Sequence, residues 1–427
     1  MATAVVNVSH HDIQAVRTPS IQSCSSTVMN GDGQRIITIT EDGDIVLRIT
    51  HQHGFIETVN SFRVSSRLLQ RSSNYFGRLL QPGRFEEAAY VEETHLRLRE
   101  NYRIIQDAPA AELPILKIQD LGRLSAVKAV DALLTDLFLI LSGRDAALSP
   151  VTVNFANLAI VADRFDALDA VRTYFKRKKL IHAIDGKTTA KLDAGLSEEK
   201  VRQRLLVGLL LDYPPWVERY SARLILRGWV GKEAPTSAAL WRDLPYCVEN
   251  ELAYRRDCIL DTVQSVQSHF LTLYTSKDRQ CRLGYDNSPQ CDSFQLGEMV
   301  RFFMRVGTVH VQGLFVDAKE PAPAYDNDVS TLLDLLRQVP EYQIDKFHTH
   351  CGIRTRMTPM LDLISLCLQY VGICAECWHN ARREHAWVDA KRPLLWKRAD
   401  LNLRDQKCST THASIRAMFM ASERLWT

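Results

Sequence analysis

The chain has 427 residues, of which 53 are basic and 50 are acidic, so its formal net charge at pH 7 is +3. Charges this evenly balanced exclude a polyelectrolyte that attracts nucleic acid through bulk electrostatics. Hydrophobic residues make up 46% of the chain, which is a normal globular composition. Because the length exceeds what one hydrophobic core usually serves, we expect two or three folded units.

Residues 1–34 are rich in Ser, Thr, Asn, Gln and Gly and show neither a hydrophobic period nor a signal-peptide pattern. We predict a disordered leader over this range. The most apolar run, 132–143, contains Asp136 and is too short to cross a bilayer core of ~30 Å. We therefore expect no membrane association and a cytoplasmic or nuclear location, in which the ten cysteines are mostly reduced thiols.

Strand patterns come first along the chain. Residues 36–40 predict a short strand, and the alternating apolar residues of 44–50 predict a strand buried on at least one face. Residues 54–64 predict the second arm of a hairpin, and the pattern returns to a strand at 115–120.

A helix is predicted directly after the hairpin, over 66–80. A hydroxyl from Ser65 or Ser66 is expected to cap it, because such a side chain satisfies an orphan backbone N–H at a helix start. Its apolar residues share one face, which we expect to be buried, and a Pro-Gly pair at 82–83 ends it. The charged stretch 84–112 is interpreted as a long link to the next strand.

Helical patterns dominate the remainder. Apolar residues repeat at helical spacing over 127–141, Ser149-Pro150 marks the start of a second helix, and a third runs to Lys179. From 196 to the end the pattern is mainly helical. We therefore divide the chain into the leader (1–34), a first domain (35–182), a helical region (196–280) and a helical C-terminal domain (281–427).

Four stretches of the first domain carry a resemblance to a known family. They are DGDIVLRI (42–49), FRVSSRLLQRSSNYFGRLL (62–80), AVDALLTDLFLILSGR (129–144) and VTVNFANLAIVADRFDALDAV (151–171). In this order they resemble a BTB/POZ domain, specifically the divergent BTB proteins of filamentous fungi. The resemblance implies an α+β fold, in which a small sheet is flanked by helices. Here a mainly α-helical C-terminal region follows it.

The resemblance also implies partners. It implies that the domain pairs with itself or with another BTB protein, and that a hydrophobic-x-Glu element binds the cullin scaffold of ubiquitin ligases. Phe85 and Glu87 match that element. An exposed Phe85 would fill a pocket on the partner while Glu87 accepts hydrogen bonds at the rim. In the alternative interpretation, Phe85 packs on its own domain and Glu87 is only solvated.

Two groups of cysteines and histidines predict a metal site in the C-terminal half. Cys281 and Cys291 form C-x9-C, and His348, His350 and Cys351 form H-x-H-C. Thiolates and imidazoles are the donors that tetrahedral zinc prefers. We take Cys281, Cys291, His348 and Cys351 as candidate zinc ligands; the alternative is isolated buried thiols with no cofactor.

A separate C-x-x-C motif, Cys374 and Cys377, falls inside a helical pattern that covers 361–378. A redox motif of this kind would follow a strand at a helix start, where the helix stabilises the thiolate. Because that context is missing, we interpret these two residues as core thiols.

Two stretches have a composition that occurs in nuclear transport signals or in nucleic-acid binding proteins. The basic run 176–179 can be a nuclear address or simply the cationic end of a helix. In 378–407, three tryptophans are interleaved with basic residues, but acidic residues interrupt the run. We interpret the tryptophans as core residues and expect no nucleic-acid partner.

Motifs of nucleotide-binding loops, metalloproteases and serine hydrolases are absent from the sequence. Such an absence does not exclude catalysis, because catalytic residues need not be close in sequence. On the resemblance, we expect a non-enzymatic protein-interaction protein that recruits a further partner. Its sharper form is a substrate adaptor of a cullin-based ubiquitin ligase. The alternatives are a BTB scaffold or transcription-associated regulator without a ligase role, and a zinc-stabilised binding module in the C-terminal half.

Overall fold

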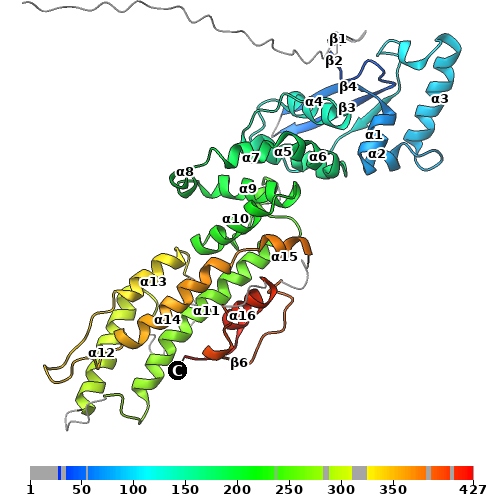
Figure 1. The fold of residues 1–427 in the computed structure, drawn as a ribbon. Coiled ribbons are helices and arrows are strands. Elements are labelled where there is room, and N and C mark those ends of the chain that lie inside the picture. Colours follow the sequence, from blue (N-terminus) through cyan, green and yellow to red (C-terminus); the bar gives the residue numbers. More distant parts are fainter. Residues whose placement is uncertain are drawn as a thin grey trace, which may run out of the picture.

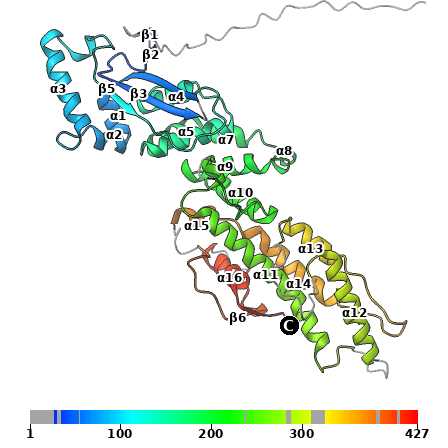
Figure 2. The ribbon, with the colours of Figure 1, turned by 180° about the vertical axis from the view of Figure 1, so that it is seen from behind.

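The computed structural model describes residues 27–29, 35–53, 56–235, 238–281, 288–309, 325–380, 386–403 and 408–426. The described part is elongated, with a small sheet and its helices at one end and a helical bundle at the other (Figure 1). The view from behind shows α9 (Glu198–Leu210) and α10 (Pro214–Arg227) between these ends (Figure 2). The expectation of a mixed α+β part followed by helices is confirmed at this level.

The sheet contains five strands among the described residues, in the spatial order β1-β2-β4-β3-β5. They are β1 (Thr27–Met29), β2 (Arg35–Thr38), β3 (Ile45–His53), β4 (Ile56–Val64) and β5 (Ile115–Ile118). β3 and β4 form the predicted antiparallel hairpin, β5 lies parallel to β3, and β2 lies parallel to β4.

The prediction that residues 1–34 form a disordered leader is wrong for the three residues of β1. Thr27–Met29 pairs antiparallel with β2, and this pairing with the sheet edge orders a segment that has no hydrophobic period of its own. The other residues of 1–34 lie outside the described part of the chain.

The single helix predicted over 66–80 is two helices, α1 (Ser66–Ser72) and α2 (Asn74–Leu79). Ser73 between them is extended, with φ −143° and ψ 123°. Its buried Oγ accepts a hydrogen bond from Phe76 N at 3.2 Å and donates one to Phe165 O at 2.6 Å. A serine side chain thus offers the backbone an alternative to a continuous helix.

The start of α1 is capped by a carboxylate and not by the serine hydroxyl that the sequence predicts. Ser65 makes no side-chain cap bond. Instead, the carboxylate of Asp44, which precedes β3, accepts hydrogen bonds from Ser66 N at 2.7 Å and from Ser66 Oγ at 2.6 Å. A carboxylate at this position also complements the helix dipole, so Asp44 connects the start of β3 to the start of α1.

The charged stretch 84–112 contains α3 (Glu86–Asn101), which the sequence interpretation missed. Ala88, Val91, Thr94 and Leu98 form a narrow buried stripe on a helix whose other residues are mostly exposed. Leu98 packs in a small cluster with Val46 of β3. The apolar spacing is helical, but the surrounding charges hide it.

Three predicted helices follow: α4 (Val130–Leu141), α5 (Thr152–Arg164) and α6 (Leu168–Lys178). α4 packs against β4 of the sheet, and α5 and α6 pack against α4. Phe62 of β4 meets Phe138 of α4, with ring centroids 5.2 Å apart. Further helices lead away from this domain: α7 (Leu180–Asp185), α8 (Ala190–Ala194), α9 (Glu198–Leu210) and α10 (Pro214–Arg227). α9 packs against α5 and against α10, so the core continues out of the first domain.

The bundle is built around α11 (Val248–Thr275), which packs against α10, α12, α14 and α16. Its other elements are α12 (Ser288–Val306), α13 (Val329–Arg337), α14 (Arg354–Cys367), α15 (Ala375–Asn380), α16 (Cys408–Met420) and the paired strands β6 (Leu395–Lys397) and β7 (Glu423–Leu425). The boundary predicted at 280/281 thus falls between helices that pack against one another, since α11 packs against α12 and α14.

Among the described residues, no helix combines the length and the apolar character that crossing a bilayer requires.

Asp44→Ala removes the acceptor of two hydrogen bonds at the start of α1. We expect the free energy of unfolding to fall by about 1–2 kcal/mol, the usual cost of a lost helix cap. Urea unfolding of the full chain, followed by circular dichroism, measures the change. Asp42→Ala, in the same turn and exposed, is the control and should have little effect. Equal effects of the two substitutions would contradict the capping role.

Candidate metal centres and docking surface

The predicted metal ligands converge from separate parts of the chain. One ligand atom each of Cys281, Cys291 and His348 lies within 4.8 Å of the other two, and Cys351 Sγ lies 3.8 Å from Cys281 Sγ. All four residues, which we call the first cluster, are buried. His350, the other histidine of the motif, is exposed and has a left-handed backbone, with φ 64°.

Helix ends position the first cluster. α11 ends shortly before Cys281, Cys291 lies in the first turn of α12, and the two remaining ligands lie in the loop before α14. Tyr274, near the end of α11, donates a hydrogen bond from its hydroxyl to Cys351 O at 3.0 Å. A metal ion held here would therefore connect three helices of the bundle.

The orientation of His348 is set by Asp345. His348 Nδ1 lies 2.8 Å from Asp345 Oδ1, and this hydrogen bond raises the pKa of His348 and lowers that of Asp345. Carboxylates commonly hold zinc-binding histidines in this way, because the bond fixes the ring and its tautomer. With Nδ1 engaged, Nε2 is the nitrogen of His348 that would bind a metal.

The thiols of the first cluster influence one another. Burial raises the pKa of Cys291, and the neighbouring Cys351 and Cys281 raise it further. A divalent cation would remove the mutual repulsion of the thiolates. Three cysteines and one histidine form a donor set of closed structural zinc sites.

The predicted docking residues lie far from this cluster, on α3 at the opposite end of the molecule (Figure 1). The side chain of Phe85, at the start of α3, is 46% exposed, and Glu87 in the first turn is exposed as well. The Arg84 guanidinium lies 5.8 Å from the centroid of the Phe85 ring. Phe85 is therefore not a core residue of its own domain.

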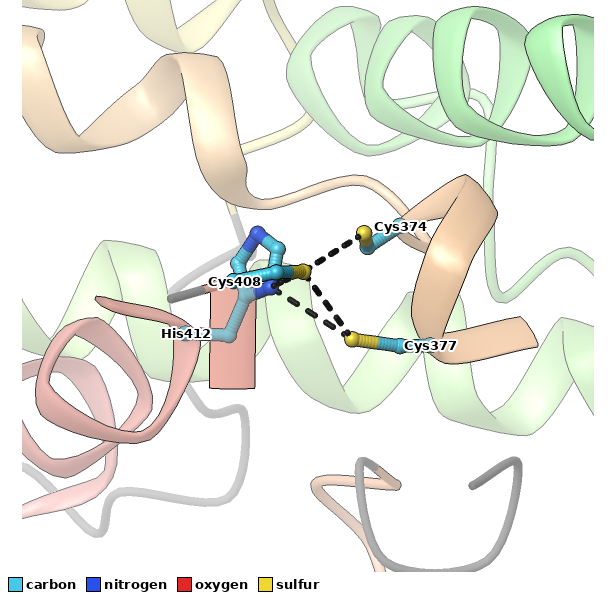
Figure 3. Close-up of side chains that lie close together, drawn as sticks. All are labelled: Cys374, Cys377, Cys408 and His412. Carbon is cyan, nitrogen blue, oxygen red and sulfur yellow. Dashed lines mark hydrogen bonds between the residues drawn. The ribbon is translucent and has the colours of Figure 1, made fainter. Parts of the chain in front are cut away.

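A second cluster contains Cys374, Cys377, Cys408 and His412 (Figure 3). One ligand atom of each lies within 4.8 Å of the other three. Cys408 Sγ lies 3.2 Å from Cys374 Sγ and 3.5 Å from Cys377 Sγ. His412 Nδ1 lies 3.1 Å from Cys408 Sγ and 3.5 Å from Cys377 Sγ. Cys377 is buried, whereas the other three are half-buried.

The predicted continuous helix over 361–378 is wrong. α14 ends at Cys367, a 3-10 turn follows at Leu368–Tyr370, and Cys374 directly precedes α15. The motif therefore lies at a helix start and not in the middle of a helix.

Tertiary contacts cause this break. A Cβ atom on Gly372 would lie 2.6 Å from Glu218 O of α10, so the chain passes α10 where only glycine fits. Arg255 of α11 donates hydrogen bonds to Val371 O at 2.9 Å and to Gly372 O at 2.7 Å. Ile373 N donates to the Ser221 hydroxyl at 2.8 Å. These bonds satisfy backbone groups that a continuous helix would have used.

Sequence reasoning missed Cys408 and His412 altogether. The signal was present: the two residues are four apart, which places them on one face of α16, and a C-x-x-C precedes them. C-x2-C followed by C-x3-H is typical zinc-ligand spacing.

The acid–base properties of the second cluster differ between its thiols. Burial raises the pKa of Cys374, but hydrogen bonds from His412, from the Cys377 backbone and from Cys408 outweigh it and bring the pKa to about 7. The pKa of Cys377 is raised to about 11, mainly by burial. Of these two thiols, Cys374 thus loses its proton more easily near neutral pH. The thiolate is the form that binds metals.

The residues that suggested nuclear transport or nucleic-acid binding make contacts within the protein. Lys176 and Lys178, at the end of α6, pair with Asp212 and Asp145 at 3.3 and 2.8 Å. The tryptophans of the tail are buried, as expected for core residues: Trp378, Trp387 and Trp396.

Comparison with known proteins found no family model, no curated protein and no solved structure that matches this chain. The two clusters are therefore assigned from geometry and ligand chemistry, and the docking residues from the resemblance and from their exposure.

Arg255→Met would leave the Glu251 carboxylate and the carbonyls of residues 371 and 372 without their buried partner. Breaking a buried ion pair typically lowers the free energy of unfolding by about 3–5 kcal/mol. Arg301→Met is the control, because Arg301 pairs with Glu298 on the surface and should contribute less than ~1 kcal/mol. Thermal and urea unfolding of both variants test this, and similar shifts would contradict the role assigned to Arg255.

Proposed function

We propose that this chain is a non-enzymatic protein-interaction protein. A BTB/POZ-like domain docks on other proteins, and the helical C-terminal half recruits a further partner. The observation that carries this proposal is the exposure of Phe85, 46%, beside the exposed Glu87 at the start of α3. Large aromatic side chains that enter a partner's pocket dominate many interfaces, and an adjacent carboxylate adds orientation.

Several features of the first domain support this proposal. The described residues contain the hairpin β3–β4, then α1, α2 and the unexpected α3, then β5 and the helices α4 to α6, an order that is compatible with the resemblance. Glu86 and Glu87 lie in the first turn of α3, where their charge favours the helix, so the segment that presents Phe85 is a regular helix start and not a loose loop. The sharper form of the proposal is that this surface binds a cullin and that the domain pairs with another BTB chain.

Phe85→Ala tests the docking surface. We expect affinity purification of the wild-type chain from its native cells to recover a cullin, and Phe85→Ala to reduce that recovery at least tenfold, since a central aromatic residue contributes ~2 kcal/mol or more. Tyr90→Ala is the matched control, because Tyr90 lies on the same helix and is also 46% exposed. Quantitative mass spectrometry of the recovered proteins gives the comparison.

Two outcomes contradict the sharper form. Recovery of a cullin that is equal with both variants would remove Phe85 from the interface. Failure to recover a cullin with the wild-type chain would leave the alternative of a BTB scaffold or transcription-associated regulator without a ligase role, and the other recovered proteins would then define it.

A second candidate function is a zinc-stabilised binding module in the C-terminal half. The convergence of the first cluster favours it, because residues from the end of α11, the start of α12 and the loop before α14 bring three thiols and one imidazole together. In this role zinc would stabilise the end of the bundle without taking part in chemistry.

Cys291→Ser tests the first cluster. We expect the purified chain to lose one equivalent of zinc, and Asp345→Asn to weaken zinc binding about 10–100-fold, because Asp345 holds the ring of His348. Cys367→Ser is the control, since Cys367 is a buried thiol of α14 outside the cluster. Elemental analysis and competition with a chelator measure these effects. Unchanged zinc content in Cys291→Ser would reject the first cluster as a metal site.

A further inference from the structure

We propose that Cys374, Cys377, Cys408 and His412 bind a second zinc ion, which connects the start of α15 to the start of α16. This inference rests on the proposed zinc-stabilised module and extends it to a site that is separate from the first cluster. The two clusters have no residue in common and involve different helices.

The distances within the second cluster fit one tetrahedral ion. Zn–S bonds of about 2.3 Å and Zn–N bonds of about 2.0–2.1 Å place neighbouring ligand atoms roughly 3.5–3.8 Å apart. Four of the separations among the sulfur atoms and the imidazole nitrogen run from 3.1 to 3.5 Å, slightly shorter than those edges. Figure 3 shows the three sulfur atoms and the imidazole turned toward one another.

The ligands are brought together by contacts outside the cluster. The segment before α15 is held by Arg255 and Ser221, as described above. α16 packs against α11, where Thr262 Oγ1 donates a hydrogen bond to Phe419 O at 3.3 Å. Contacts outside the cluster thus position the segment before α15 and the start of α16 separately. The four ligands would already be in place when a metal ion binds, so ordering them would reduce the binding free energy only slightly.

The burial of the second cluster argues against core thiols. Core cysteines are normally fully buried among apolar side chains. Here Cys374, Cys408 and His412 are only half-buried. Cys374, Cys377 and His412 line a cavity of about 360 Å³ together with Arg255, Trp387 and Tyr370. A cation bound here would accept a ligand atom from all four residues, which hydrogen bonds among the four side chains cannot do at once.

The donor set selects the kind of ion. Three thiolates and one imidazole in a tetrahedral arrangement favour zinc over hard cations such as magnesium and calcium, which prefer oxygen. A set of four protein ligands leaves no open position for a substrate, so the site is structural rather than catalytic. Its role would be to fix α15, and the wall of the cavity, against the C-terminal helix.

Zinc counting on the full chain tests the proposal. We expect two equivalents of zinc per wild-type chain, purified under reducing conditions without chelator. Cys408→Ser and His412→Ala should each lower the content to one, and combination with Cys291→Ser should lower it to none. His412→Cys should restore two equivalents, because a fourth thiolate is also a zinc ligand. Cobalt substitution should give the visible absorption of tetrahedral cobalt thiolate, reduced in His412→Ala.

Matched controls come from the same neighbourhood. Cys247 is exposed and lines the same cavity, and His379 is an exposed histidine on α15. Cys247→Ser and His379→Ala should both keep two equivalents of zinc. A loss of zinc in either control would show that the variants act by disturbing the fold, and would overturn the assignment.

The outcomes separate this site from the first cluster. One equivalent in the wild type that is lost in Cys291→Ser, and not in His412→Ala, would overturn the second site and leave the first. One equivalent lost in His412→Ala alone would support the second site and reject the first. A Cys374–Cys408 disulfide in the reduced, zinc-supplemented protein, found by mass spectrometry after alkylation, would also overturn the proposal.

Discussion

The C-terminal half depends on one buried guanidinium, that of Arg255. It pairs with Glu251 at 2.7 Å, donates to the carbonyls of residues 371 and 372, and lies 4.9 Å from the centroid of the Trp387 ring. Glu251 in turn accepts hydrogen bonds from the backbone N–H groups of Trp387 and Val388. A charge buried in this way is tolerated because its donors have acceptors, and the same bonds hold two irregular segments against α11.

Two other buried arginines, Arg256 and Arg424, also donate hydrogen bonds to backbone carbonyl groups. Arg256 donates to Ile225 O, near the end of α10, at 2.7 Å and to Tyr325 O, before α13, at 2.8 Å. Arg424 donates to Met418 O and Phe419 O at the end of α16. The last carbonyl groups of a helix have no hydrogen-bond donor within the helix. Carbonyl groups in buried connections between helices also need donors from elsewhere. Arginine side chains satisfy such carbonyl groups at these places in the bundle.

The two clusters lie at opposite ends of α11. The first follows its C-terminal end, and the second borders a cavity that Val248 and Glu251 line near its N-terminal end. A helix of 28 residues is about 42 Å long. Metal ions at both places would therefore stabilise the bundle along its length. α3, which begins directly after the exposed Phe85, lies at the end of the first domain that is away from the bundle (Figure 1). Docking and metal binding would thus be structurally independent.

The sequence by itself determined the elements whose signal is local. The hairpin β3–β4 and the helices α4 to α6 follow from apolar periods of two and 3.6, which depend only on neighbouring residues. The ligands of the first cluster were found because cysteine and histidine stand out in polar segments. α3 was missed because its apolar stripe is narrow. Only the tertiary structure decided that Cys374 begins a helix instead of continuing one. That break depends on Glu218 O and Arg255, more than a hundred residues away, and it directs the C-x-x-C toward Cys408 and His412. Contacts of this kind join residues that are far apart in the sequence. They therefore produce no local hydrophobic period from which they could be predicted.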